Sequence, residues 1–299
     1  MGVRTERPSR MFTTILVPTD GSAGAEATID HALELGRTYE AEIHSLYVVE
    51  TGGTPAELAA DDREELYAPS ERRGREATIR ITDVAEENDL QAAREVREGV
   101  PHRTILEYVD EQAVDMIVMG THGRTGADRA RLGSTTERVL ALSDVPVLSV
   151  RLTDDGDTPA PAYDRIVIPT DGSDAADRAA ENALEIAEKY DASVNVVYVV
   201  DTTTYDLEDA PRSIVGLLKE GGENATETVA EMADERGLEA TTAIRRGVPA
   251  EKLLEYASTV DADLVAMGTR GRAVGSGQLL GSTTARVVRR SPIPVLTSN

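Results

Sequence analysis

Short runs of apolar, mostly β-branched residues alternate along this chain with longer segments in which apolar residues recur at helical spacing. Each short run predicts a buried strand, and each segment of helical spacing predicts a helix. The first half contains four such runs, at residues 12–17, 42–49, 116–119 and 145–150, and the more polar segment 93–97 is expected to be its third strand. The second half has the same order, with runs near 165–169, 193–200, 241–246, 263–267 and 293–297.

The segments between the strands carry helix signals. Ala27, Leu33 and Leu35 have helical spacing, residues 70–88 read as a charged surface helix, and Pro101 stands where a helix would begin. Ser134 and Glu137 form a capping-box pattern, so Ser134 is expected to be an N-cap, as is Ser282 in the second half. The polar residues 51–69 are expected to be a loop.

Strands and helices that alternate in this way predict an α/β fold, with two tandem open parallel five-stranded sheets that carry helices on both faces. Residues 153–162 are rich in Asp, Pro and Ala and read as a linker. We therefore expect one domain at residues 11–152 and a second at residues 163–299.

The two halves also repeat in sequence. Residues 15–22, Ile-Leu-Val-Pro-Thr-Asp-Gly-Ser, return at 166–173 as Ile-Val-Ile-Pro-Thr-Asp-Gly-Ser, and Gly99-Val100-Pro101 returns at residues 247–249. A period near 150 residues is too long for a solenoid and indicates a duplicated domain.

A glycine pattern carries the candidate chemistry. Gly120 and Gly123 are followed after nine residues by Gly133-Ser134-Thr135, and the pattern returns as Gly268, Gly271 and Gly281-Ser282-Thr283. Glycine allows the close backbone approach that a phosphate-wrapping loop needs, and a helix that begins at Gly-Ser would attract anions. Asp20, Val48 and Gly120 all lie at predicted strand ends, where such sheets bind ligands.

Net charge and composition limit the classes of protein to which this chain can belong. The formal net charge of −23 argues against nucleic-acid binding, and the scarcity of lysine suggests adaptation to a high-salt cytoplasm. Against this background the glycine loops are locally basic, with Arg124, Arg129 and Arg131 in the first, and Arg270 and Arg272 in the second. There is no cysteine, no run long enough to span a bilayer, and no apolar signal segment in residues 1–10, so a cytoplasmic protein is expected.

Several common sites are absent from the sequence. There is no P-loop lysine motif, no Gly-x-Gly-x-x-Gly after the first strand and no nucleophile elbow. The four histidines lack metal-ligand spacing.

The chain resembles the universal stress protein (UspA) family in three motifs: the strand-end Pro-Thr-Asp-Gly-Ser, the Gly-Val-Pro turn and the long glycine pattern. The resemblance occurs once in each half and together covers nearly the whole chain. The resemblance implies an adenine nucleotide alpha hydrolase-like, Rossmann-like fold and the ATP-binding branch of the family, with Mg²⁺ or Mn²⁺ held through the phosphates. Asp20 and Asp171 would contact adenosine, Val48 and Val199 would line the adenine pocket, and the glycine loops would hold ribose and phosphates. The full set of residues implied for the sites is Pro18, Thr19, Asp20, Val48, Met119, Gly120, Gly123, Arg124, Gly133, Ser134 and Thr135, with Pro169, Thr170, Asp171, Val199, Met267, Gly268, Gly271, Arg272, Gly281, Ser282 and Thr283.

Other interpretations stay open at this point. Asp20 and Asp171 could simply cap the following helix, or close the turn before Gly21 and Gly172. The function implied is a nucleotide-dependent regulatory or stress-response module; the alternatives are a slow ATPase or autophosphorylating enzyme, and an interaction module that needs no nucleotide. The fifth strands could pair at the sheet edges, which would make the halves an internal pseudo-dimer, and two chains could form a homodimer. The sequence names no protein partner.

Overall fold

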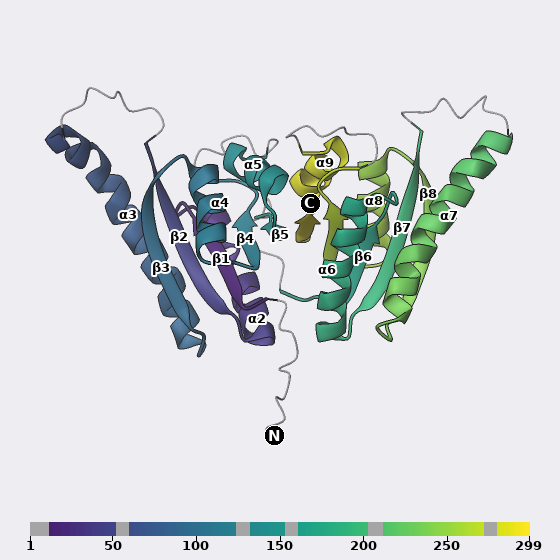
Figure 1. Ribbon diagram of the computed structural model, residues 1–299, viewed down its shortest axis with the longest axis horizontal. Coiled ribbons are helices and arrows are strands. Elements are labelled where there is room, and N and C mark those ends of the chain that lie inside the picture. Colours follow the sequence, from purple (N-terminus) through teal and green to yellow (C-terminus); the bar gives the residue numbers. More distant parts are fainter. Residues whose placement is uncertain (1–11, 52–59, 124–131, 153–160, 203–211, 272–279) are drawn as a thin grey trace, which may run out of the picture.

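A single ten-stranded sheet runs through both halves of the protein (Figure 1). The computed structural model describes residues 12–51, 60–123, 132–152, 161–202, 212–271 and 280–299. Within them the strand order is β3-β2-β1-β4-β5-β10-β9-β6-β7-β8. Every predicted strand is present, with these bounds: β1 Thr14–Thr19, β2 Glu42–Glu50, β3 Ala92–Gly99, β4 Met116–Gly120, β5 Val147–Val150, β6 Arg165–Pro169, β7 Ser193–Asp201, β8 Ala240–Gly247, β9 Leu264–Gly268 and β10 Val295–Ser298.

The two halves are joined by their fifth strands. Within each half the paired strands are parallel, whereas β5 and β10 pair antiparallel, with Leu148 opposite Leu296. The hydroxyl of Ser149 also donates to the carbonyl oxygen of Val295 at 3.0 Å. The two predicted five-stranded sheets are therefore present and are fused edge to edge, which covers one edge of each.

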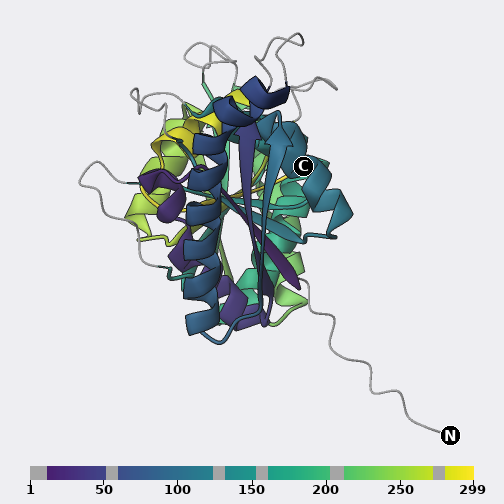
Figure 2. The ribbon, with the colours of Figure 1, turned by 90° about the vertical axis from the view of Figure 1, so that its left-hand side faces the viewer.

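Helices cover both faces of this sheet. Side chains alternate along each strand, so Ile15 belongs to a buried cluster that continues along the sheet under α2, α3, α6 and α7. Leu16 belongs to the cluster on the other face, which continues under α4, α5, α8 and α9. Figure 2 shows α3 and α4 on opposite sides of the strands. The helices are α1 Ala23–Glu26, α2 Ile29–Tyr39, α3 Ala60–Glu87, α4 Pro101–Glu111, α5 Ser134–Leu142, α6 Asp174–Tyr190, α7 Arg212–Asp234, α8 Pro249–Thr259 and α9 Ser282–Arg290.

Helix α3 corrects one expectation, because it begins at Ala60 and not at residue 70. Pro69 lies inside the helix, on its exposed side. The turn before it is held by Tyr67, which is 7% exposed and packs with Tyr47 and Val49 of β2. Burial of this tyrosine outweighs the local cost of the proline, and a polar sequence that looks like a loop folds as helix.

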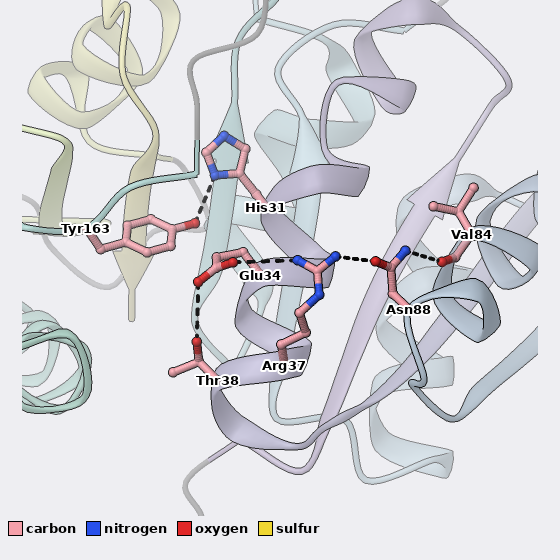
Figure 3. A network of polar contacts seen from close by, with 7 residues as sticks. All are labelled: His31, Glu34, Arg37, Thr38, Val84, Asn88 and Tyr163. Atoms are coloured by element: carbon pink, nitrogen blue, oxygen red, sulfur yellow. Dashed lines mark hydrogen bonds and ion pairs between the residues drawn. The ribbon is translucent and has the colours of Figure 1, made fainter.

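A second contact between the halves lies at the start of the second repeat (Figure 3). Tyr163 precedes β6, is 1% exposed and forms a 2.9 Å hydrogen bond through its hydroxyl with Nδ1 of His31 on α2. Burial raises the pKa of Tyr163 well above its ordinary value, so the hydroxyl keeps its proton. The equivalent position in the first repeat is Phe12, which has no hydroxyl.

The neighbouring polar groups organise α2 itself. Glu34 accepts from Thr38 at 3.5 Å and lies 3.6 Å from the guanidinium of Arg37. Arg37 in turn donates to Asn88, which donates to the carbonyl oxygen of Val84 at 2.7 Å. These contacts link α2 to the end of α3, and the Tyr163 hydrogen bond links the same helix to the second half.

Replacing Tyr163 with phenylalanine is expected to lower the free energy of unfolding by about 1 kcal/mol, because a buried hydrogen bond is lost while the ring stays in place. Unfolding in urea at high KCl measures the change. Tyr256→Phe is the matched control, since Tyr256 is 4% exposed and its hydroxyl forms no hydrogen bond with the described residues. Equal stabilities for the two variants would show that the contact with His31 contributes nothing.

Candidate functional site

A cavity of about 220 Å³ opens at the carboxyl ends of β1, β2 and β4 in the first half. Strand order reverses here, because the chain runs outward from β1 to β2 and β3 and then returns to place β4 on the other side of β1. A crevice at such a reversal is the usual ligand site of an open α/β sheet. The cavity is lined by Pro18, Thr19, Asp20, Ala25, Leu46, Val48, Glu50, Pro101, Ile105, Met119, Gly120, His122, Gly123, Gly133, Ser134, Thr135 and Thr136.

The turn after β1 positions the Asp20 carboxylate. The N–H of Ser22 donates to Asp20 Oδ1 at 3.0 Å, and Gly21, with φ +75°, allows the left-handed backbone that this turn requires. Ser22, not Asp20, caps α1, since its hydroxyl accepts from the N–H of Ala25 at 3.3 Å. Of the two alternatives left open by the sequence, Asp20 thus closes the turn and does not cap the helix.

The glycines after β4 are required by close backbone packing. A Cβ on Gly120 would overlap the carbonyl oxygen of Gly24, and a Cβ on Gly24 would lie 2.5 Å from the carbonyl oxygen of His122. A Cβ on Gly123 would likewise lie 2.5 Å from Asp20 Oδ2. The glycine loop therefore lies directly against α1 and the Asp20 carboxylate, with no room for a side chain between them.

The start of α5 differs from the capping-box prediction. Its N-cap is Gly133, no side chain caps the helix, and Ser134 is the first helical residue. Thr136 is instead the side chain that fixes this end, because its hydroxyl donates to the carbonyl oxygen of Gly120 at 2.9 Å. Gly281 is the N-cap of α9 in the same way, so the expectation that Ser134 and Ser282 are N-caps is wrong. The first-turn N–H groups of α5 are thus not used by a side-chain cap, and the first two residues of the helix, Ser134 and Thr135, line the cavity.

The second half repeats these local contacts. Asp171 Oδ1 accepts from Ser173 at 3.1 Å, and a Cβ on Gly271 would overlap the Asp171 carboxylate. The Thr284 hydroxyl donates to the carbonyl oxygen of Gly268 at 2.8 Å, as Thr136 does to Gly120. One difference lies at residue 24, where the second half has Ala175 and the first helix continues unbroken as α6.

Two arginines act on His102, which lies near the first cavity. Burial lowers the pKa of His102 below its ordinary value, and the positive charges of Arg138 and Arg103 lower it further. His102 and Arg103 lie in the first turn of α4, next to the cavity residue Pro101, and Arg138 lies on α5. In the second half the positions of His102 and Arg103 hold Ala250 and Glu251, and Lys252 stands at the position of Thr104.

The structure brings together all of the residues that the sequence implied for the first site and that lie in the described part of the chain. Arg124, Arg129 and Arg131 of the first glycine loop, and Arg272 of the second, lie outside the described residues. The cavity also includes residues that sequence reasoning missed: Ala25, Leu46, Glu50, Pro101, Ile105, His122 and Thr136. A signal was available for Thr136, because Gly-Ser-Thr-Thr occurs in both halves.

Comparisons with known proteins agree with this architecture. The sequence model of the universal stress protein family matches residues 11–151 and again residues 162–298. A universal stress protein of Methanocaldococcus jannaschii is 42% identical over 137 residues, which cover 45% of this chain and 81% of that protein. One from Mycolicibacterium smegmatis is 27% identical over 293 residues, 94% of this chain and 95% of that protein. The crystal structure of a universal stress protein from Archaeoglobus fulgidus shares the fold, with a TM-score of 0.72 at 23% identity, covering 98% of this chain and 99% of that one.

The fold and the site define a tandem, doubly wound α/β protein with a cavity where the strand order reverses. The two matches to the family model together cover most of the chain. The chain belongs to the universal stress protein family.

Two properties of the described residues bear on membranes and metal ions. No helix among them is both long and apolar enough to cross a membrane. Within the same residues, no group of three or more His, Cys, Asp or Glu side chains is placed to hold a metal ion.

Proposed function

We propose that each half of this protein binds ATP and that nucleotide occupancy makes the chain a regulatory module. The observation that supports this most is the convergence of the implied first-half residues, from Pro18 to Thr135, on one cavity at the reversal of strand order. These residues come from β1, β2, β4 and the start of α5, and only the tertiary fold places them together.

The cavity has two chemically different ends. Leu46, Val48 and Ile105 supply an apolar wall on which a nucleobase can pack, and Asp20 supplies a carboxylate that can accept from a sugar hydroxyl. Ser134 and Thr135 supply hydroxyls beside first-turn N–H groups at the positive end of α5, which suits phosphate oxygens. The positive charges near His102 favour the same polyanion.

A divalent cation would be bound at this site by the phosphates of the nucleotide. Because no carboxylate–imidazole group in the described chain is placed to hold a metal, Mg²⁺ or Mn²⁺ would be bound mainly by the phosphates, with hydroxyls such as Ser134 nearby. The cation would neutralise phosphate charge. The protein residues would then supply orientation and hydrogen bonds.

Nucleotide binding can change the position of neighbouring helices, because residues that line the cavity also make the contacts that pack α1 and α5. Gly120, whose carbonyl oxygen anchors Thr136 of α5, lies against α1 through Gly24. A nucleotide that orders this loop therefore also sets the position of α5, which lies near the junction of the halves in Figure 1.

Calorimetric titration of ATP with Mg²⁺ into the protein, in molar KCl, tests the proposal. We expect a stoichiometry of about two per chain, and about one for Gly133→Val and for Gly281→Val, since added side chains there press on the carbonyl oxygens of Thr121 and Thr269. Gly216→Val is the matched control, because a Cβ at Gly216 meets nothing within 4 Å, and it should keep both sites. ADP formation in wild type, Asp20→Ala and Asp171→Ala distinguishes slow turnover from binding alone. No heat at several temperatures, with no nucleotide retained after purification, would overturn the proposal.

A further inference from the structure

Arg270 belongs to the glycine loop of the second half, yet its side chain contacts a helix of the first half. Its Nη2 donates to the carbonyl oxygen of Ala141, in the last turn of α5, at 3.3 Å. The same nitrogen donates at 3.3 Å to Oδ1 of Asn299, which follows β10. Asn299 in turn donates from its Nδ2 to the carbonyl oxygen of Ser143, the C-cap of α5.

These contacts provide hydrogen-bond donors from the second half for two carbonyl oxygens at the C-terminal end of α5. The last carbonyl groups of a helix have no intrahelical partner, and they form the negative end of its dipole. A guanidinium is the side chain best suited to this position, because it combines a positive charge with several N–H donors. The second half therefore supplies the C-terminal cap of α5, whose other end borders the first cavity at Ser134.

Arg270 also occupies the position that corresponds to a cavity residue of the first half. The equivalent residue in the first half is His122, which lines the first cavity and whose Nδ1 lies 2.9 Å from the Thr121 hydroxyl. Arg270 is next to Gly271, which packs against the Asp171 carboxylate. One residue thus holds, in the second repeat, the position of a cavity residue, and its side chain caps the phosphate-side helix of the first half.

We propose that Arg270 is a positioning residue for the first site and couples the two sites negatively. The inference rests on the proposed function, since it requires ATP in both halves. A phosphate oxygen in the second site would compete with the carbonyl oxygen of Ala141 for the guanidinium, and a charge-assisted hydrogen bond is about twice as strong as a neutral one. Filling the second site then removes the cap of α5 and weakens binding at the first.

A local reporter separates the two sites. The chain has no cysteine, so Glu137→Cys, on the exposed first turn of α5, accepts a single environment-sensitive fluorophore that reports ATP binding at the first site. Val199→Trp, which fills the apolar wall of the second site far along the chain from Arg270, blocks that site. First-site dissociation constants are then measured with the second site open or blocked.

Blocking the second site is expected to tighten the first by about threefold, the size of effect expected for one cation at a helix end. Arg270→Gln should abolish this difference and leave the first site about threefold weaker even in the blocked chain. Arg270→Lys, which keeps the charge, should restore part of the affinity. Arg290→Gln is the control, because the side chain of this arginine of α9 makes no hydrogen bond or ion pair with any described residue, and its loss should leave the difference intact.

A second readout needs no nucleotide. Hydrogen exchange at the amide of Ser143, which donates to Val139 at 2.9 Å, should be faster in Arg270→Gln than in wild type or Arg290→Gln. If ATP binds the first site equally well in the blocked chain with and without Arg270→Gln, the coupling is wrong while the proposed function stands. If ATP binds to neither site, both proposals fail.

Discussion

Gly120→Ala is expected to weaken ATP binding at the first site by on the order of 30-fold and to lower the free energy of unfolding by about 2 kcal/mol. The added Cβ would overlap the carbonyl oxygen of Gly24, which is backbone and cannot turn aside as a side chain could. Relief requires β4 and α1 to move apart. That movement displaces the loop between Gly120 and Gly123, which borders the cavity beside Asp20.

The chain offers the same substitution without the clash. Gly221 lies in α7, and a Cβ there meets nothing within 4 Å, so Gly221→Ala should raise stability by about 0.5–1 kcal/mol through the lower entropy of the unfolded chain. Urea unfolding measures stability, and titration with the first-site reporter measures affinity. Normal affinity and stability in Gly120→Ala would show that the loop does not need the close packing described above.

Lowering KCl from about 1 M to about 0.1 M is expected to reduce the free energy of unfolding by on the order of 3 kcal/mol, because the screening length rises from about 3 Å to about 10 Å. The net charge is −23, and carboxylates lie close together on exposed surfaces such as Asp61, Asp62, Glu64 and Glu65 at the start of α3. Two like charges 10 Å apart in water repel by about 0.4 kcal/mol before screening, and many such pairs add together.

A charge variant distinguishes this repulsion from a general effect of salt on the hydrophobic core. Replacing Asp61, Asp62, Glu64 and Glu65 with the corresponding amides removes four charges and leaves the packing of the helix unchanged, since all four side chains are exposed. This variant should lose less stability than wild type when KCl is lowered. Equal unfolding curves for the wild-type protein in low and high KCl would contradict the expectation of salt adaptation.

Local sequence accounts for most elements, because most strands are short runs rich in β-branched residues and most helices have apolar residues at helical spacing. Predictions from local sequence were wrong where a contact with a residue far away in the sequence outweighs the local conformational preference. Residues 60–69 look like a loop, but Tyr67 finds a buried place against β2 and the helix continues through Pro69. Ser134 looks like an N-cap, but Gly133 takes that position while Thr136 bonds back to Gly120.

The candidate site shows the same division. Its glycines and Asp20 stand out because they recur in both halves, and repetition is visible without structure. Leu46, Glu50 and Ile105 carry no such signal, since each is an ordinary residue until three strands and two helices bring it to one cavity.

The sequence by itself determined the duplication, the order of strands and helices and the glycine pattern, because these follow from residue type and spacing along the chain. Only the tertiary structure decided that the two sheets join as one through β5 and β10. It also decided that Gly120 must lack a side chain, because the backbone of Gly24 packs directly against it. The tertiary structure likewise places Arg270 of the second half at the C-terminal end of α5 in the first half. Those facts depend on distances between residues far apart in sequence, and folding sets these distances through the packing of the whole core.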